Sequence, residues 1–240
     1  MTTLGPYVFS DHDVARTLRH GVELIDLITD GLGPVAEAAA APHRTRAESI
    51  VADVAPSDPA AALGLFWSEW REAMAAVRSC GAFGPPDVGT ATGLFTSDGG
   101  VPKARVDRLE VGWGGVVGDR QGDRDNHGRP WQALCLWSTE SIDHFRADGH
   151  PLAAGLAGEN VSVTGLDWAR VRPGVRLQLG DVLAEVSAYA VPCRKNAAWF
   201  LDGRFDAMHH RNGIHSRLYA TVLEPGTIAH GDAVLLEPPG

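Results

Sequence analysis

The 240-residue sequence has three cysteines and no C-x-x-C pair, which argues against both a disulfide framework and a zinc knuckle. It lacks an apolar run of the ~20 residues that a membrane-spanning helix needs, and it lacks a charged-then-apolar leader at its start. The formal net charge is −9, whereas binding to a nucleic-acid backbone requires clustered Lys and Arg. We therefore expect a cytoplasmic protein with reduced thiols that binds neither membranes nor nucleic acid.

Apolar residues recur at helical spacing in two stretches of the N-terminal part. Asp11 is suited to cap a first helix that ends near Gly31. Asp58 as N-cap and Pro59 at the first helical position predict the start of a second helix. The polar residues 42–46 between these stretches indicate a connection rather than a helix.

Glycine and proline are concentrated in residues 79–89, and the sequence pattern changes there. Beyond this boundary, short and often alternating apolar segments end at Gly, Pro or Asp, and one short helix is expected between about 139 and 149. Many short strands with few helices are typical of a closed or nearly closed barrel. We predict an α+β, mainly β fold, with a helical region over residues 1–88 and a β-barrel over residues 89–240.

Cys193 follows the strand-like stretch 182–190 and stands directly after Pro192. Because proline cannot donate to a sheet ladder, the strand should stop or lie at an edge just before the thiol. Arg194 and Lys195 add positive charge, which lowers the pKa of a nearby thiol and favours the nucleophilic thiolate. Two interpretations stay open from the residues alone, a small buried hydrophobic side chain or a reactive thiol at the rim of the barrel.

The other two cysteines have different surroundings. Cys135 is flanked by wholly apolar residues, so we expect an inert core position. Cys80 falls in the Gly- and Pro-rich boundary segment.

Residues 115–129 combine several glycines with many charged side chains, Arg124 and Asp125 among them. Such a loop could clamp an anion, but the favoured interpretation is a solvated turn whose charges pair with each other. A polar surface loop is also favoured over a metal site for three histidines whose spacing fits no strong ligand pattern. They are His209, His210 and His215.

Six stretches, taken in order, resemble the MOSC domain, the family named after the C-terminal domain of molybdenum cofactor sulfurase. They are residues 97–103, 115–121, 126–138, 149–168, 172–196 and 216–232. No single motif is decisive, but the ordered set is specific and covers about residues 90–238. The resemblance implies a MOSC-type β-barrel of the compact bacterial branch, with a pocket over the family's cysteine, which matches Cys193.

The resemblance also implies roles for individual residues. In relatives the matching thiol is thought to ligate the molybdenum of a pterin cofactor or to carry sulfane sulfur as a persulfide. His127 matches a histidine that could hydrogen-bond a ligand oxygen or shuttle a proton, or only hold its loop. The candidate catalytic residues are thus Cys193 and His127, with Cys193 also the metal ligand. The candidate cofactor-binding residues are Lys103, Arg129, Glu159, Asn160, Arg194, Lys195 and Arg217.

One turn departs from the family pattern, which usually reads H-G-G-P followed by an acidic residue and arginine. This chain has Arg129 before Pro130, and Gln132 at the usual arginine position. A cation is gained at one position and lost at another, so we expect a reshaped anion or cofactor site. The N-terminal helices are expected to serve as a dimerisation or pocket-covering arm.

The resemblance implies an enzyme in which Cys193 meets a molybdenum pterin cofactor or a sulfur-bearing small molecule. The reaction would be reduction of an N-oxygenated substrate or transfer of sulfur. The alternatives are a non-catalytic sulfur or cofactor carrier, or a repurposed enzyme that forms or cleaves a C–S bond. The implied partners are a small-molecule substrate, a redox partner or sulfur donor protein, and a second copy in a homodimer.

Overall fold

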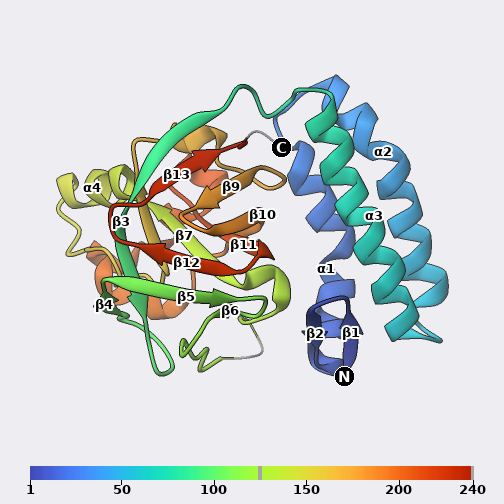
Figure 1. Ribbon diagram of the computed structural model, residues 1–240, viewed down its shortest axis with the longest axis horizontal. Helices are drawn as coiled ribbons and strands as arrows, with labels where there is room; N and C mark the ends of the chain where they lie inside the picture. Colours follow the sequence, from blue (N-terminus) through green and yellow to red (C-terminus); the bar gives the residue numbers. More distant parts are fainter. Residues whose placement is uncertain (124–125, 239–240) are drawn as a thin grey trace. The chain divides into compact units, whose positions relative to one another are not determined.

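The computed structural model describes residues 1–123 and 126–238, and the chain divides into two compact units. The first unit comprises Met1–Pro85 with Pro173–Val175, and the second comprises Pro86–Arg172 with Arg176–Gly240. Figure 1 shows the helices of the first unit and the strands of the second. Within the described part of the chain, no helix combines the length and the apolar character needed to cross a membrane.

Three long helices build the first unit, preceded by a short β-hairpin. The hairpin is β1 (Thr2–Leu4) with β2 (Tyr7–Phe9), and the helices are α1 (Asp11–Thr29), α2 (Pro34–Ser49) and α3 (Pro59–Ser79). A π-helical turn over Ile50–Val54 continues from α2. All three helices pack against one another, and their neighbouring axes are visible in Figure 1.

The helix starts follow ordinary capping chemistry. Asp58 caps α3 by accepting a hydrogen bond from the Ala61 backbone N–H at 2.9 Å, as the sequence predicts. At α1 the prediction is wrong by one residue, because Ser10 rather than Asp11 is the cap. The Ser10 hydroxyl accepts from the Asp13 N–H at 3.1 Å and the Ser10 N–H donates to the Asp13 carboxylate at 3.0 Å, a reciprocal pair that Asp11 could not make.

The predicted polar connection over residues 42–46 is also wrong, because these residues lie inside α2. Pro42 removes one backbone hydrogen bond and is costly in a helix interior. The alanine-rich residues before it favour a helix strongly. In addition, α2 packs against both α1 and α3, and this packing offsets the cost of the proline.

The second unit contains a closed barrel, which confirms the predicted fold class. Among the described residues, seven strands form the ring in the order β3, β8, β7, β11, β10, β9 and β13, and β13 pairs back onto β3. Their bounds are β3 (Asp87–Thr96), β7 (Leu134–Ser138), β8 (Val161–Thr164), β9 (Arg176–Leu179), β10 (Val182–Ala190), β11 (Arg217–Glu224) and β13 (Ala233–Leu236).

The remaining strands and one helix lie outside this ring. Strand β4 (Ala104–Val106) extends β3 outside it, and β12 (Gly226–Ala229) forms a separate sheet with β5 (Arg108–Gly112) and β6 (Gly115–Val116). The predicted short helix is α4 (Thr139–Ala147), capped by Ser138. The connection that contains α4 returns the chain to the end of the sheet where β7 began, so β7 and β8 can pair in parallel.

The register of the barrel places several polar side chains near one end of it. Cys135 on β7 is paired with Tyr219 on β11, and Arg217 at the start of β11 is paired with Ala190 at the end of β10. Every residue of β7 is buried, so the alternation in its sequence does not separate a buried face from an exposed one. The end of β10 leads directly to Cys193.

Candidate functional site

Cys193 lies where the chain leaves the barrel after β10. Pro192 follows the strand without joining it, and Cys193 occupies the cap position of a 3₁₀ turn over Arg194–Trp199. Its backbone N–H donates to Asn196 Oδ1 at 3.3 Å, and its half-buried Sγ lies 3.8 Å from the same oxygen. The thiol is therefore held at the rim of the barrel rather than sealed in the core.

Cys193 borders a pocket together with five of the other residues singled out from the sequence. These are Lys103, His127, Asn160, Lys195 and Arg217. The pocket walls also include Cys135, Asp119 and Tyr219. The site thus brings a thiol, an imidazole and several cationic groups into one cavity, although these residues come from distant parts of the sequence.

Arg217 links the elements that surround the thiol. Its guanidinium is buried and donates to the Ala157 carbonyl and, at 3.2 Å, to Asn196 Oδ1. Asn196 in turn donates to the Ala157 carbonyl at 3.2 Å. One guanidinium therefore fixes both the loop around Ala157 and the asparagine that contacts Cys193.

His127 and Tyr219 form a hydrogen-bonded pair at the pocket wall, with the imidazole Nδ1 2.8 Å from the phenol oxygen. Burial, followed by the positive charge of Arg217, holds the pKa of His127 below its ordinary value. Burial also raises the pKa of the Tyr219 hydroxyl. His127 is therefore neutral and Tyr219 protonated at neutral pH.

A buried ion pair forms another part of the wall. Lys103 Nζ lies 2.6 Å from Asp119 Oδ2, with side chains that are 10% and 2% exposed. Asn160 donates to the same Asp119 oxygen at 3.1 Å and accepts from the Cys135 N–H at 3.1 Å. Asp119 therefore balances the positive charge of Lys103. Asn160 connects this ion pair to the backbone of β7 at Cys135.

Two predicted cations do not line the pocket. Arg194 is exposed. Arg129 is buried and donates to Gln132 Oε1 at 2.9 Å and to the Asn126 carbonyl at 3.2 Å. The two departures from the family turn, at positions 129 and 132, are therefore partners of each other, so the added guanidinium braces the turn.

The structure also places the side chains that the sequence assigned to the core or to surface loops. Cys135 is buried as expected, and burial raises the pKa of its thiol, but it also borders the pocket. His215 hydrogen-bonds Ser141 at 3.0 Å, and the only candidate metal cluster found among the described residues includes none of the three late histidines. Arg124 and Asp125 lie outside the described residues.

Sequence reasoning singled out neither Asn196 nor Tyr219 as a site residue. Asn196 stands three residues after Cys193, the spacing of a capping pair, and that signal could have identified it. Tyr219 lies in an apolar strand with no such signal, and only its pairing opposite Cys135 brings it to the pocket.

Glu159 is not one of the residues that line the pocket. It is fully buried, its Oε1 accepts from the Gly155 N–H at 2.6 Å, and its Oε2 has no hydrogen-bond partner among the described residues. Burial raises the pKa of this carboxyl group. A protonated carboxyl group is therefore favoured in the folded state.

The raised pKa of Glu159 predicts that the free energy of unfolding of the wild type falls as the pH rises, and that Glu159→Gln lacks this fall. Above the ordinary Glu pKa of about 4.3, the unfolded chain releases the proton while the folded chain keeps it, so the free energy of unfolding falls as the pH rises through the folded-state pKa. Urea unfolding from pH 4 to pH 8 should show the variant gaining stability relative to the wild type with rising pH.

Glu140→Gln is the matched control with the opposite sign. Burial opposes ionisation of Glu140, but hydrogen bonds from Thr164 and Gly165 outweigh it and hold the pKa below its usual range. The contribution of Glu140 is therefore lost as the pH falls. Parallel pH profiles for the wild type and Glu159→Gln would contradict the assignment of a raised pKa.

Comparisons with known proteins agree with this geometry. The family model for the MOSC domain matches residues 123–235. YflK of Bacillus subtilis is 31% identical over 115 residues, 48% of this chain and 52% of that protein. YiiM of Escherichia coli is 29% identical over 119 residues, 48% of this chain and 53% of that protein. The chain thus spans about half the length of the curated relatives it matches.

A solved structure shows the same fold at lower identity. The crystal structure of the YUAD protein from Bacillus subtilis matches with a TM-score of 0.53 and 19% identity, covering 65% of this chain and 99% of that chain. The ordered motifs, the closed barrel and the family match all concern the same part of the sequence. Residues 123–235 of the barrel unit therefore match the MOSC domain family.

Proposed function

We propose that the barrel pocket binds a molybdenum pterin cofactor through the Cys193 thiolate and reduces a small N-oxygenated substrate. The observation that carries this proposal is that Cys193 borders one pocket with His127, Lys195 and Arg217. The similarity to the MOSC domain family adds the link to molybdenum cofactor chemistry. The electrons would come from a separate redox partner.

The donor set of the pocket suits such a cofactor. A thiolate is a soft ligand that favours metals with an affinity for sulfur. Lys195 is exposed and borders the pocket. An ammonium group so placed is suited to an anionic group of the pterin. The residues present therefore fit the cofactor.

The protein's own groups would have separate tasks. When bound, the cofactor supplies the redox chemistry, while the chain supplies a ligand, orientation and a site for proton transfer. Asn196 Oδ1 lies within reach of the Cys193 thiol and its backbone N–H, so Asn196 orients the sulfur. The Nδ1 atom of His127 is occupied by Tyr219, which leaves Nε2 as the ring nitrogen that can hold or pass a proton.

The test measures the metal and sulfur content of protein made in a molybdenum-sufficient host. Elemental analysis should detect molybdenum in the wild type and at least about tenfold less in Cys193→Ser. The reason is that replacing a residue that hydrogen-bonds a metal ligand already lowers metal affinity by roughly 10–100-fold, and Cys193 is the proposed ligand itself. Activity with an N-hydroxylated base and a chemical reductant should fall in parallel.

Cys80→Ser is the matched control, because Cys80 is an exposed thiol at the end of α3 in the other unit. It should leave the molybdenum content unchanged. Extra sulfur on Cys193 by intact mass, without molybdenum, would instead favour the sulfur-carrier alternative. Wild-type protein with neither metal nor extra sulfur, and with no change in Cys193→Ser, would overturn the proposal.

A further inference from the structure

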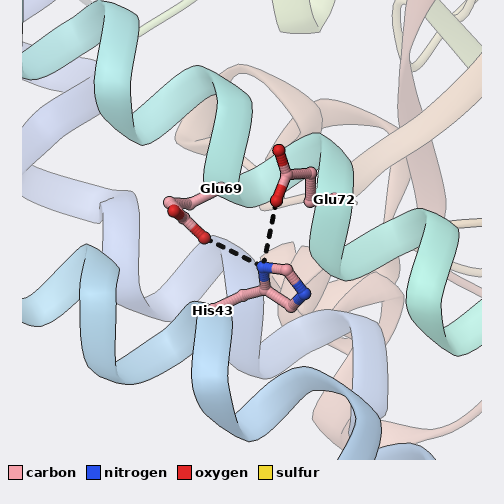
Figure 2. Close-up of side chains that lie close together, drawn as sticks. All are labelled: His43, Glu69 and Glu72. Carbon is pink, nitrogen blue, oxygen red and sulfur yellow. Dashed lines mark hydrogen bonds and ion pairs between the residues drawn. The ribbon is translucent and has the colours of Figure 1, made fainter.

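A second cluster of chemically active side chains lies between two helices of the first unit. His43 on α2 faces Glu69 and Glu72 on α3, as Figure 2 shows. The two glutamates are three residues apart, which places them on one face of the helix. The packing of α2 along α3 then brings the imidazole opposite both carboxylates.

The atoms are spaced as metal ligands are. His43 Nδ1 lies 2.9 Å from Glu69 Oε2 and 3.8 Å from Glu72 Oε2. One ligand atom from each residue lies within 4.8 Å of the others. A zinc ion sits roughly 2.0–2.2 Å from its nitrogen and oxygen ligands, so its ligand atoms are separated by about 3–3.5 Å. Small side-chain adjustments would meet this requirement.

The hydrogen bonds around His43 are in conflict. Glu69 Oε2 at 2.9 Å requires a proton on Nδ1, whereas Arg46 Nη2 at 2.8 Å donates toward the same atom and requires a lone pair there. No tautomer of imidazole satisfies both neighbours. A cation in place of the Arg46 Nη2 contact would satisfy the nitrogen lone pair and both carboxylates together.

The carboxylates are also placed to meet a cation. Arg46 Nε binds the other oxygen, Glu69 Oε1, at 2.7 Å, which turns Oε2 toward His43. Glu72 is 63% exposed, so an ion can reach the cluster from solvent and keep water as a further ligand.

We propose that His43, Glu69 and Glu72 bind one divalent transition-metal ion, of which Zn²⁺ is the best match. Imidazole nitrogen together with carboxylate oxygen suits Zn²⁺ better than Mg²⁺, which prefers oxygen ligands alone. Three protein ligands leave a position open to water. The ion would join α2 to α3, and the site is distinct from the barrel pocket.

The test titrates Zn²⁺ into the full chain by calorimetry, in a Cys193→Ser background so that the thiol does not compete. We expect one equivalent to bind, with at least tenfold weaker binding after His43→Ala or Glu72→Gln. Zn²⁺ should also raise the melting temperature of the parent protein and not that of His43→Ala, while Mg²⁺ at the same concentration should raise neither.

His20→Ala is the matched control. His20 and Glu23 form an exposed histidine–glutamate pair on α1, with Nδ1 3.3 Å from Glu23 Oε2, and the candidate cluster does not include them. Zn²⁺ binding should be unchanged in this variant. Because Glu72 is largely exposed, Glu72→Gln is expected to fold, and circular dichroism checks this. Equal Zn²⁺ binding by the parent, His43→Ala and Glu72→Gln would overturn the proposal, as would an absence of binding to the parent.

Discussion

Asp119→Ala is expected to lower the free energy of unfolding by about 3–5 kcal/mol, because it leaves a buried ammonium group without its partner. Lys103 Nζ lies 2.6 Å from Asp119 in a pair that is almost fully buried. The same carboxylate accepts the Ser97 N–H at 2.7 Å and the Asn160 amide at 3.1 Å. Urea unfolding monitored by tryptophan fluorescence measures the loss.

Asp98→Ala provides the comparison within the same part of the barrel unit. Asp98 also pairs with a cation, Arg120, at 2.9 Å, but these side chains are 84% and 74% exposed. An exposed pair contributes roughly 0–1 kcal/mol, so this variant should remain close to the wild type. Losses of the same size in the two variants would show that burial of the Lys103–Asp119 pair has no energetic consequence.

Arg217→Met is expected to lower the free energy of unfolding by about 3 kcal/mol, since a hydrogen bond to a charged group contributes roughly 1.5–3 kcal/mol and the variant loses both that Arg217 donates. The variant keeps an apolar stem but loses the donors to the Ala157 carbonyl and to Asn196. Because Asn196 contacts the thiol, the rate of Cys193 alkylation by iodoacetamide should change as well.

Arg194→Met is the control variant. It removes a positive charge next to Cys193 in the sequence but leaves Arg217 and its hydrogen bonds in place. Arg194 is next to Cys193 in sequence, but it is exposed, so its replacement should alter the free energy of unfolding by less than about 0.5 kcal/mol. If Arg217→Met and Arg194→Met gave equal stability and equal alkylation rates, Arg217 would have no positioning role at Cys193.

Local sequence signals were reliable where the structure depends on neighbours in the chain. Asp58 and Pro59 start α3, and Ser138 caps α4, because caps act over three or four residues. Pro192 marks the end of β10 before Cys193, since proline has no N–H for the ladder. The prediction at Pro42 failed because packing between helices outweighed a local penalty.

The contents of the pocket depended on contacts between distant segments. The sequence indicated Cys193 through its neighbours in the chain, and His127 and Arg217 through the family resemblance. It did not indicate that Tyr219 holds His127 or that Asn196 holds the thiol. It also placed Arg129 in an anion site, whereas that guanidinium braces its own turn.

The sequence by itself determined the barrel fold, the similarity to the MOSC domain family and the position of Cys193 after a strand, because alternation, proline chemistry and ordered motifs are properties of neighbouring residues. Only the tertiary structure decided which charges meet. Strand register brings Arg217, Tyr219 and Cys135 together, and helix packing sets His43 opposite Glu69 and Glu72. Such pairings depend on the distance between side chains in the folded chain, and separation along the sequence does not encode that distance.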